Sequence, residues 1–123
     1  MKHRGTVALE YAFGLAALLL LTLGIIDCGR LFWTYATLVR ASEAAARCAV
    51  VDRVQCGSDA QIAKFAATQA YGLAIDASAF IVSAPECGMM IAGHDTVILT
   101  LPWLVTGPDR ITLTASACYP RQS

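Results

Sequence analysis

The sequence predicts an α+β protein in which one long N-terminal helix carries a small head with a short helix and about three antiparallel strands. An apolar segment over residues 6–26 continues with helical periodicity to about residue 50. A shorter helical pattern follows near residue 60, and the hydrophobic period changes to two after residue 79. The 123 residues leave room for one compact domain.

The composition indicates a membrane-associated protein. Hydrophobic residues make up 57% and charged residues 15% of the chain, against about 45–50% and 25% in soluble proteins. Nine basic and nine acidic side chains give zero net charge, which excludes a general nucleic-acid binder because no basic excess would neutralise phosphates. So apolar a chain is also not intrinsically disordered.

Residues 6–26 are long enough to cross a bilayer. The segment reads TVALEYAFGLAALLLLTLGII and contains one charge, Glu10. At about 1.5 Å per residue, a helix of this length spans roughly 30 Å, the thickness of one hydrocarbon core. Lys2 and Arg4 precede it, and positive charge favours the cytoplasmic side, so we expect the N-terminus inside and the rest outside.

Two common export signals fit this segment poorly. A secretory signal peptide ends in an A-x-A-like cleavage site, but Asp27-Cys28 follows Ile26. Lipid attachment at Cys28 would need a small residue before the cysteine, where this chain has Asp27.

Glu10 has two interpretations. A carboxylate near the centre of a membrane helix costs about 2.5–3.5 kcal/mol, and an interfacial glutamate that faces the headgroups costs less. Alternatively, removal of Met1–Gly5 would leave an α-amino group on Thr6, four residues before Glu10. That ammonium would neutralise Glu10 of the same helix or of a staggered neighbour, so that charge pairing selects the assembled state.

The residues around Glu10 resemble a known processing site. Arg4-Gly5-Thr6-Val7-Ala8-Leu9-Glu10-Tyr11, followed by a leucine-rich run, resembles the prepilin-peptidase site of type IV pilins, and Glu10-Tyr11 resembles the Flp (tight adherence, type IVb-like) branch. Residues 23–32 and the alanine-rich residues 41–49 are similar to TadE-like pseudopilins, as is the end of the chain at residues 115–120.

This resemblance implies a minor pilin or pseudopilin involved in assembly of tight-adherence pili. Prepilin peptidase would cleave after Gly5 and expose Thr6, and Glu10 and Tyr11 would act in assembly. The implied location is a bacterial inner membrane, as a single-pass protein with a periplasmic head, in or at the base of a pilus. The implied partners are other pilins (the Flp major pilin and a TadF-like relative), the peptidase, the pilus assembly platform and membrane lipid.

A different class of function shares the topology. An unprocessed, single-pass anchored binding module with an extracytoplasmic domain would need neither Gly5 nor Glu10. In either case the chain divides into residues 1–5 (a leader in the first reading), a membrane part over 6–26, a periplasmic helix over 27–50 and a head over 51–123.

The helix continues beyond the membrane. One apolar face recurs at helical spacing through Leu31, Tyr35, Leu38, Ser42, Ala45 and Ala49. No proline occurs before Pro85, so we expect one helix over residues 6–50. Phe32, Trp33 and Tyr35 follow the predicted span and suit an interfacial aromatic belt.

The head contains one more helix and three strand candidates. Ser58 or Asp59 is the expected cap of the second helix, and Gly72 its expected end. The strand candidates are Phe80–Val82, Thr96–Leu101 and Arg110–Ala115, with turns expected at Gly93–Asp95 and Thr106–Asp109. We expect a three-stranded antiparallel sheet on the upper part of the long helix.

Four cysteines fall in the predicted external part: Cys48, Cys56, Cys87 and Cys118. A small extracytoplasmic domain favours two disulfides. Three pairings are possible, of which we favour Cys48–Cys56 and Cys87–Cys118. The spacing lacks the C-x2-C unit of zinc sites, so we expect no metal, and Cys28 is left unpaired.

We expect no catalysis and no cofactor. The chain has two histidines, His3 and His94. His94-Asp95 would place its side chains on opposite faces of a strand. No glycine-rich phosphate loop, H-E-x-x-H or G-x-S-x-G motif is present.

Overall fold

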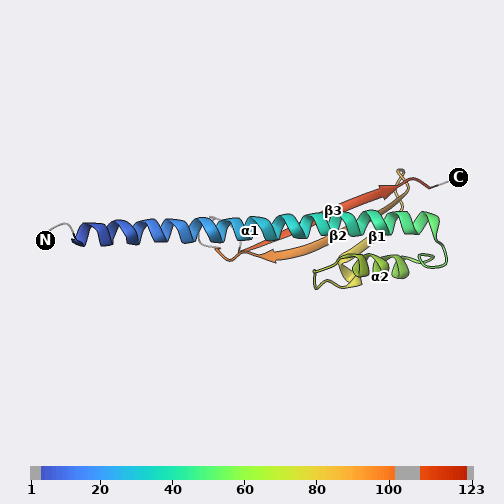
Figure 1. The fold of residues 1–123 in the computed structure, drawn as a ribbon. Helices are drawn as coiled ribbons and strands as arrows, with labels where there is room; N and C mark the ends of the chain where they lie inside the picture. Colours follow the sequence, from blue (N-terminus) through green and yellow to red (C-terminus); the bar gives the residue numbers. More distant parts are fainter. Residues whose placement is uncertain (1–3, 102–108, 122–123) are drawn as a thin grey trace.

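One helix dominates the molecule (Figure 1). The computed structural model describes residues 4–101 and 109–121, in which α1 runs from Arg4 to Val51 as 48 residues of uninterrupted helix. At about 1.5 Å per residue it is roughly 70 Å long. The long helix with a small α+β head is confirmed, with α1 ending within one residue of the expected position.

The second helix, α2, runs from Asp59 to Gln69 and begins at the expected cap. The Ser58 hydroxyl accepts a hydrogen bond from the backbone N–H of Gln61, and the Gln61 side chain accepts one from the N–H of Gly57. This reciprocal arrangement satisfies N–H groups that a helix start otherwise leaves without partners. Gly72 lies three residues beyond the helix end, in a turn where its φ is +80°.

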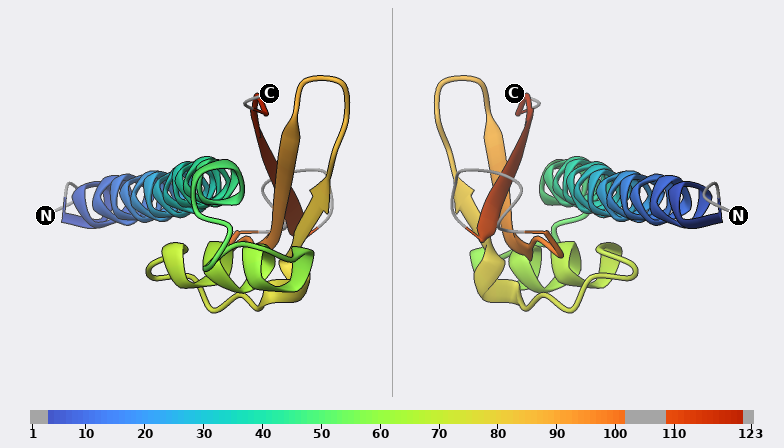
Figure 2. Two further views of the ribbon diagram at one scale, coloured as in Figure 1. Left: turned by 90° about the vertical axis from the view of Figure 1, so that its right-hand side faces the viewer. Right: turned by 90° about the vertical axis from the view of Figure 1, so that its left-hand side faces the viewer.

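Three strands form one antiparallel sheet, as expected. Its order is β1 (Phe80–Ser83), β2 (Met89–Ile98) and β3 (Arg110–Tyr119), and a 3₁₀ turn, η1 (Ala77–Ala79), precedes β1. The strands run beside the second half of α1, while α2 lies next to α1 and below the sheet (Figures 1 and 2). The C-terminal half of α1 therefore supports the head.

The turn expected at Gly93–Asp95 is wrong, because these residues lie within β2. Gly93 pairs with Phe80 of β1, and a Cβ at Gly93 would lie 2.7 Å from Cε1 of Phe80 and 3.3 Å from Cδ2 of Leu38. Gly93 is thus a packing glycine that makes room for an aromatic ring. The reversal occurs instead between β1 and β2, in the segment that contains Pro85 and Gly88.

The expected strand Thr96–Leu101 begins too late, because β2 starts at Met89, and it extends too far at its end. β2 stops at Ile98. The N–H of Leu99 still donates to the carbonyl of Asp109, the next position in the β2–β3 register, but the N–H groups of Thr100 and Leu101 donate to Asp27 of α1 instead. The third strand, in contrast, continues four residues past Ala115, to Tyr119. Of the turn expected at Thr106–Asp109, residues 106–108 lie outside the described residues.

Small side chains allow α1 to approach the sheet closely. Ala41, Ala45 and Ala46 are buried, and the fully buried Ser42 hydroxyl donates to the carbonyl of Ala115 on β3 at 3.4 Å. Leu38 and Ile91 are the large side chains that fill this core. On the face expected to be apolar, Tyr35 is 48% exposed.

Candidate functional site

The first half of α1 lies outside the core of the head. Every residue from Gly5 to Leu19 is exposed, and Asp27 is the first buried residue after Gly5. The helix is long and apolar enough to cross a membrane, and its most apolar window has none of its residues buried in the protein. A core helix of a soluble protein would bury such a window, so the exposed apolar surface fits a membrane anchor.

The residues expected for processing and assembly share this exposed segment. Gly5, Thr6, Glu10 and Tyr11 all lie in α1 and are exposed. Thr6 and Glu10 are four residues apart and therefore lie on one face of the helix. Glu10 also lines a shallow groove with Val7, Tyr11, Gly14, Leu15 and Leu18.

The structure shows a polar contact that sequence reasoning missed. Asp27, immediately after the predicted span, is 8% exposed. Its carboxylate accepts the backbone N–H of Thr100 at 2.9 Å and that of Leu101 at 3.3 Å. Arg30, one turn later, donates to the carbonyl of Ile98 at 3.3 Å and lies 3.8 Å from the Asp27 carboxylate.

Asp27 and Arg30 thus clamp the end of β2 to α1. An acidic and a basic residue three apart, directly after an apolar segment, indicate polar contacts at this level of the helix, but they do not indicate the partners of those contacts. The pKa of Asp27 lies below its ordinary value, and hydrogen bonds from Thr100 are the largest cause. The N–H of Leu101 and the charge of Arg30 lower the pKa further, whereas burial of the carboxylate raises it. Asp27 is therefore held as a carboxylate at neutral pH.

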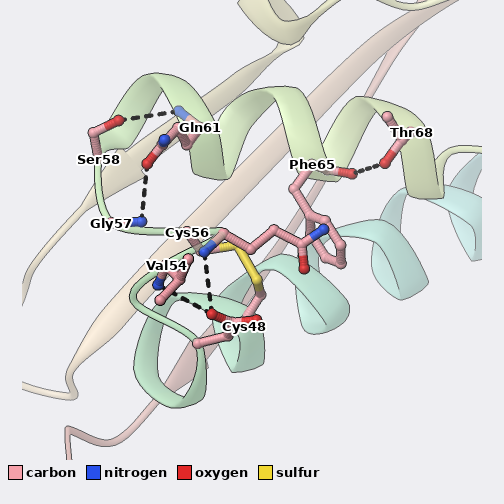
Figure 3. The surroundings of a disulfide bond; sticks show 10 residues. Cys48, Val54, Cys56, Gly57, Ser58, Gln61, Phe65 and Thr68 are labelled. Carbon is pink, nitrogen blue, oxygen red and sulfur yellow. Dashed lines mark hydrogen bonds between the residues drawn. A yellow bond between two sulfur atoms is a disulfide. The ribbon is translucent and has the colours of Figure 1, made fainter.

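Two disulfides form, in the pairing that the sequence favoured. Cys48–Cys56 joins the end of α1 to the segment that leads into α2, and Cys87–Cys118 joins the β1–β2 connection to the end of β3. Around the first bridge, the Asp52 side chain accepts from the backbone N–H groups of Val54 and Gln55, and the Ser58 cap follows directly (Figure 3). Cys28 is a free, exposed cysteine.

His94 and Asp95 are neighbours in β2, and their side chains lie on opposite faces of the sheet. His94 is exposed, and its neighbour Asp95 is half-buried on the side of β2 that faces α1. Within residues 4–101 and 109–121, no group of three His, Cys, Asp or Glu side chains is placed to hold a metal ion.

Comparison with known proteins identifies the helical part of the chain. The family described as TadE-like protein matches residues 5–47. This segment is similar to the TadE-like family. The match covers the exposed apolar segment, the Asp27–Arg30 clamp and most of the helix that supports the head.

The TadE-like match ends before the head begins. Residues 48–123, which hold α2, the sheet and both disulfides, lie outside it. No curated protein and no solved structure matched the chain.

Proposed function

We propose that this TadE-like chain is a minor pilin or pseudopilin that takes part in assembly of tight-adherence pili. The observation that carries the proposal is the exposed apolar half of α1, which begins at Gly5 and bears a single carboxylate, Glu10, within a segment that matches the TadE-like family. In the proposal, prepilin peptidase cleaves after Gly5, residues 6–26 span the inner membrane, and the head lies in the periplasm.

The geometry supports a role in helix packing rather than catalysis. Glu10 lies on an exposed helix face beside Gly14, where the lack of a side chain lets a second helix come close. Once cleavage has created an ammonium group on Thr6, Glu10 of one chain meets a cation at similar depth on a neighbour. An isolated carboxylate in lipid is costly, so this pairing favours the packed state over the separated one.

N-terminal mass mapping of the membrane-extracted protein tests the proposal. Cells that express the chain with an active prepilin peptidase are compared with cells that carry an inactive peptidase. The expected N-terminus is Thr6 in the first strain and Met1 in the second. Gly5→Leu is the matched variant, which blocks cleavage while leaving the span intact.

Retention of Met1 in the presence of active peptidase would overturn the proposal. The chain would then be a single-pass anchored binding module, which needs no cleavage.

A further inference from the structure

A hollow of about 570 Å³ opens between α1, the loop after α2 and the end of β2. Its walls include apolar, aromatic and charged side chains from all three elements: Ile26, Arg30, Trp33, Leu73, Asp95 and Ile98. It is separate from the processing and assembly residues, which lie about four to six helical turns away along α1.

The hollow lies at the level where the exposed apolar segment ends. Ile26 is the last residue of the predicted span, and it is also the first α1 residue in the wall. From there the lining residues follow one face of α1 through Gly29, Arg30 and Trp33. If residues 6–26 cross the bilayer, the hollow opens at the membrane surface on the side of the head.

Exposed apolar and aromatic side chains surround this level. Phe32 is 75% exposed, Trp33 59% and Ile98 56%. The loop after α2 adds Tyr71, which is 72% exposed, and its neighbour Gly72 packs beside the Trp33 indole, where a Cβ would lie 3.5 Å from Nε1. Amphipathic rings at a membrane boundary prefer the headgroup region.

The hollow also presents two opposite charges. Arg30 uses Nη1 to donate hydrogen bonds to the carbonyl of Ile98 and to Oγ1 of Thr100. The side chain of Arg30 is 51% exposed. Asp95 uses Oδ1 to accept the N–H of Thr96. In the described part of the chain, no lysine or arginine nitrogen lies within 4.0 Å of the Asp95 carboxylate.

We propose that this hollow binds the headgroup of a zwitterionic phospholipid that carries a primary ammonium. Arg30 binds the phosphate, Asp95 binds the ammonium, Ile26 and Ile98 contact the first carbons of the acyl chains, and Trp33 packs beside the headgroup. The occupant is a membrane lipid rather than a soluble phosphate because the apolar walls are continuous with the exposed surface of the span. The inference rests on the membrane anchor of the proposed function.

Tryptophan quenching in reconstituted vesicles tests the headgroup preference. The full chain carries Trp103→Phe, so that Trp33 is the single emitter, and the vesicles contain brominated lipids with either ethanolamine or choline headgroups. Emission from Trp33 is expected to fall with both lipids, with a roughly twofold to fivefold stronger response to the ethanolamine lipid, the range that a partly exposed charge pair supplies.

Variants at two aspartates test whether the Asp95 carboxylate causes the preference for the ethanolamine headgroup. Asp95→Asn retains the oxygen that accepts the Thr96 N–H, so the strand is expected to persist while the preference for the ethanolamine headgroup disappears. The matched control is Asp109→Asn, which removes an exposed carboxylate next to Arg110 and leaves the preference intact. Equal quenching of wild-type Trp33 by both lipids would overturn the headgroup assignment.

A second tryptophan position tests the membrane anchor independently of the lipid site. Leu15→Trp, combined with Trp33→Phe and Trp103→Phe, places the emitter within the span. Strong quenching at position 15 with none at Trp33 leaves the anchor standing and overturns the lipid site. The lack of quenching at both positions overturns the anchor and the lipid site together.

Discussion

The Asp27 carboxylate accepts the backbone N–H of Thr100 at 2.9 Å, across 73 residues of sequence. The same side chain accepts from Leu101, and Arg30 holds the carbonyl of Ile98. Two side chains on one turn of α1 thus form hydrogen bonds with the backbone at the end of β2. The contact fixes how far the sheet reaches along α1, and it lies at the end of the predicted membrane span.

Replacing Asp27 should loosen this end of the sheet. Asn has one acceptor oxygen and no charge, so the Asp27→Asn variant should let the Thr100 and Leu101 amides exchange with solvent about tenfold faster, equivalent to the loss of one net hydrogen bond. Hydrogen exchange in detergent micelles measures this. The amides of β2 near Ile91 serve as the internal control and should be unaffected; unchanged exchange at Thr100 and Leu101 would contradict the clamp.

The clamp also predicts a dependence on pH. Hydrogen bonds from Thr100 hold the pKa of Asp27 below the value of 3.8 that an unperturbed Asp has. A depressed pKa means that the stabilisation is complete above the unfolded-state value and is lost as the pH falls through the lower, folded-state value. The stability difference between wild type and Asp27→Asn, from urea unfolding, should therefore be constant from pH 7 to about 5 and shrink below about 4.

Local patterns predicted most of the fold. Helical periodicity and the lack of proline before Pro85 are sufficient to predict α1. The capping residue Ser58 is sufficient to predict the start of α2. Alternation located part of each strand. In each case the signal lies within a few residues of the element, so no knowledge of distant contacts was needed.

The errors occurred where a distant residue decides the outcome. The turn expected at Gly93 rests on the usual role of glycine, but here the ring of Phe80 occupies the space that a side chain would need. The end of β2 is set by Asp27, far away in the chain. Asp27 and Arg30 lie within residues 23–32, which resemble TadE-like pseudopilins, but their partners are backbone groups, which have no sequence signature.

The packing role of Gly93 makes an alanine substitution costly. In Gly93→Ala the new methyl would press on the Phe80 ring and on Leu38, with an expected loss of about 1–3 kcal/mol in the free energy of unfolding, typical of an overpacked core. Chemical unfolding of the head in detergent provides the measurement. Combining Gly93→Ala with Phe80→Leu should recover part of the loss, because the smaller side chain vacates the space.

A second glycine provides the matched control. Gly29 lies in α1, where an added Cβ would meet nothing within 4 Å, so Gly29→Ala should leave the head as stable or raise its stability by up to about 1 kcal/mol through helix propensity. Similar losses from both substitutions would show that the Phe80 contact does not explain the effect.

The two disulfides should differ in their contribution to stability. They close loops of 8 and 31 residues, for which loop-closure entropy predicts about 2.5 and 3.7 kcal/mol. Paired alanine variants, Cys48→Ala with Cys56→Ala and Cys87→Ala with Cys118→Ala, should both lower the urea midpoint of the head. Buried surface adds to the first loss, since Cys56 is 2% exposed. An unchanged midpoint in either variant would show that the bridge in question does not stabilise the head.

Glu10 supplies the sharpest test of how the helix packs. Glu10→Gln keeps the size and hydrogen-bonding capacity of the side chain but removes the charge that the Thr6 ammonium would meet. Cleavage after Gly5 does not need that charge pair, so mass mapping should still find Thr6 at the N-terminus. Co-purification with other pilins should fall about tenfold or more, because a partly buried ion pair has lost one of its two charges. Glu43→Gln alters an exposed glutamate on the same helix beyond the predicted span and should leave both measurements unchanged. Normal co-purification of Glu10→Gln would mean that the carboxylate only faces the headgroups, and that helix packing depends on the apolar surface alone.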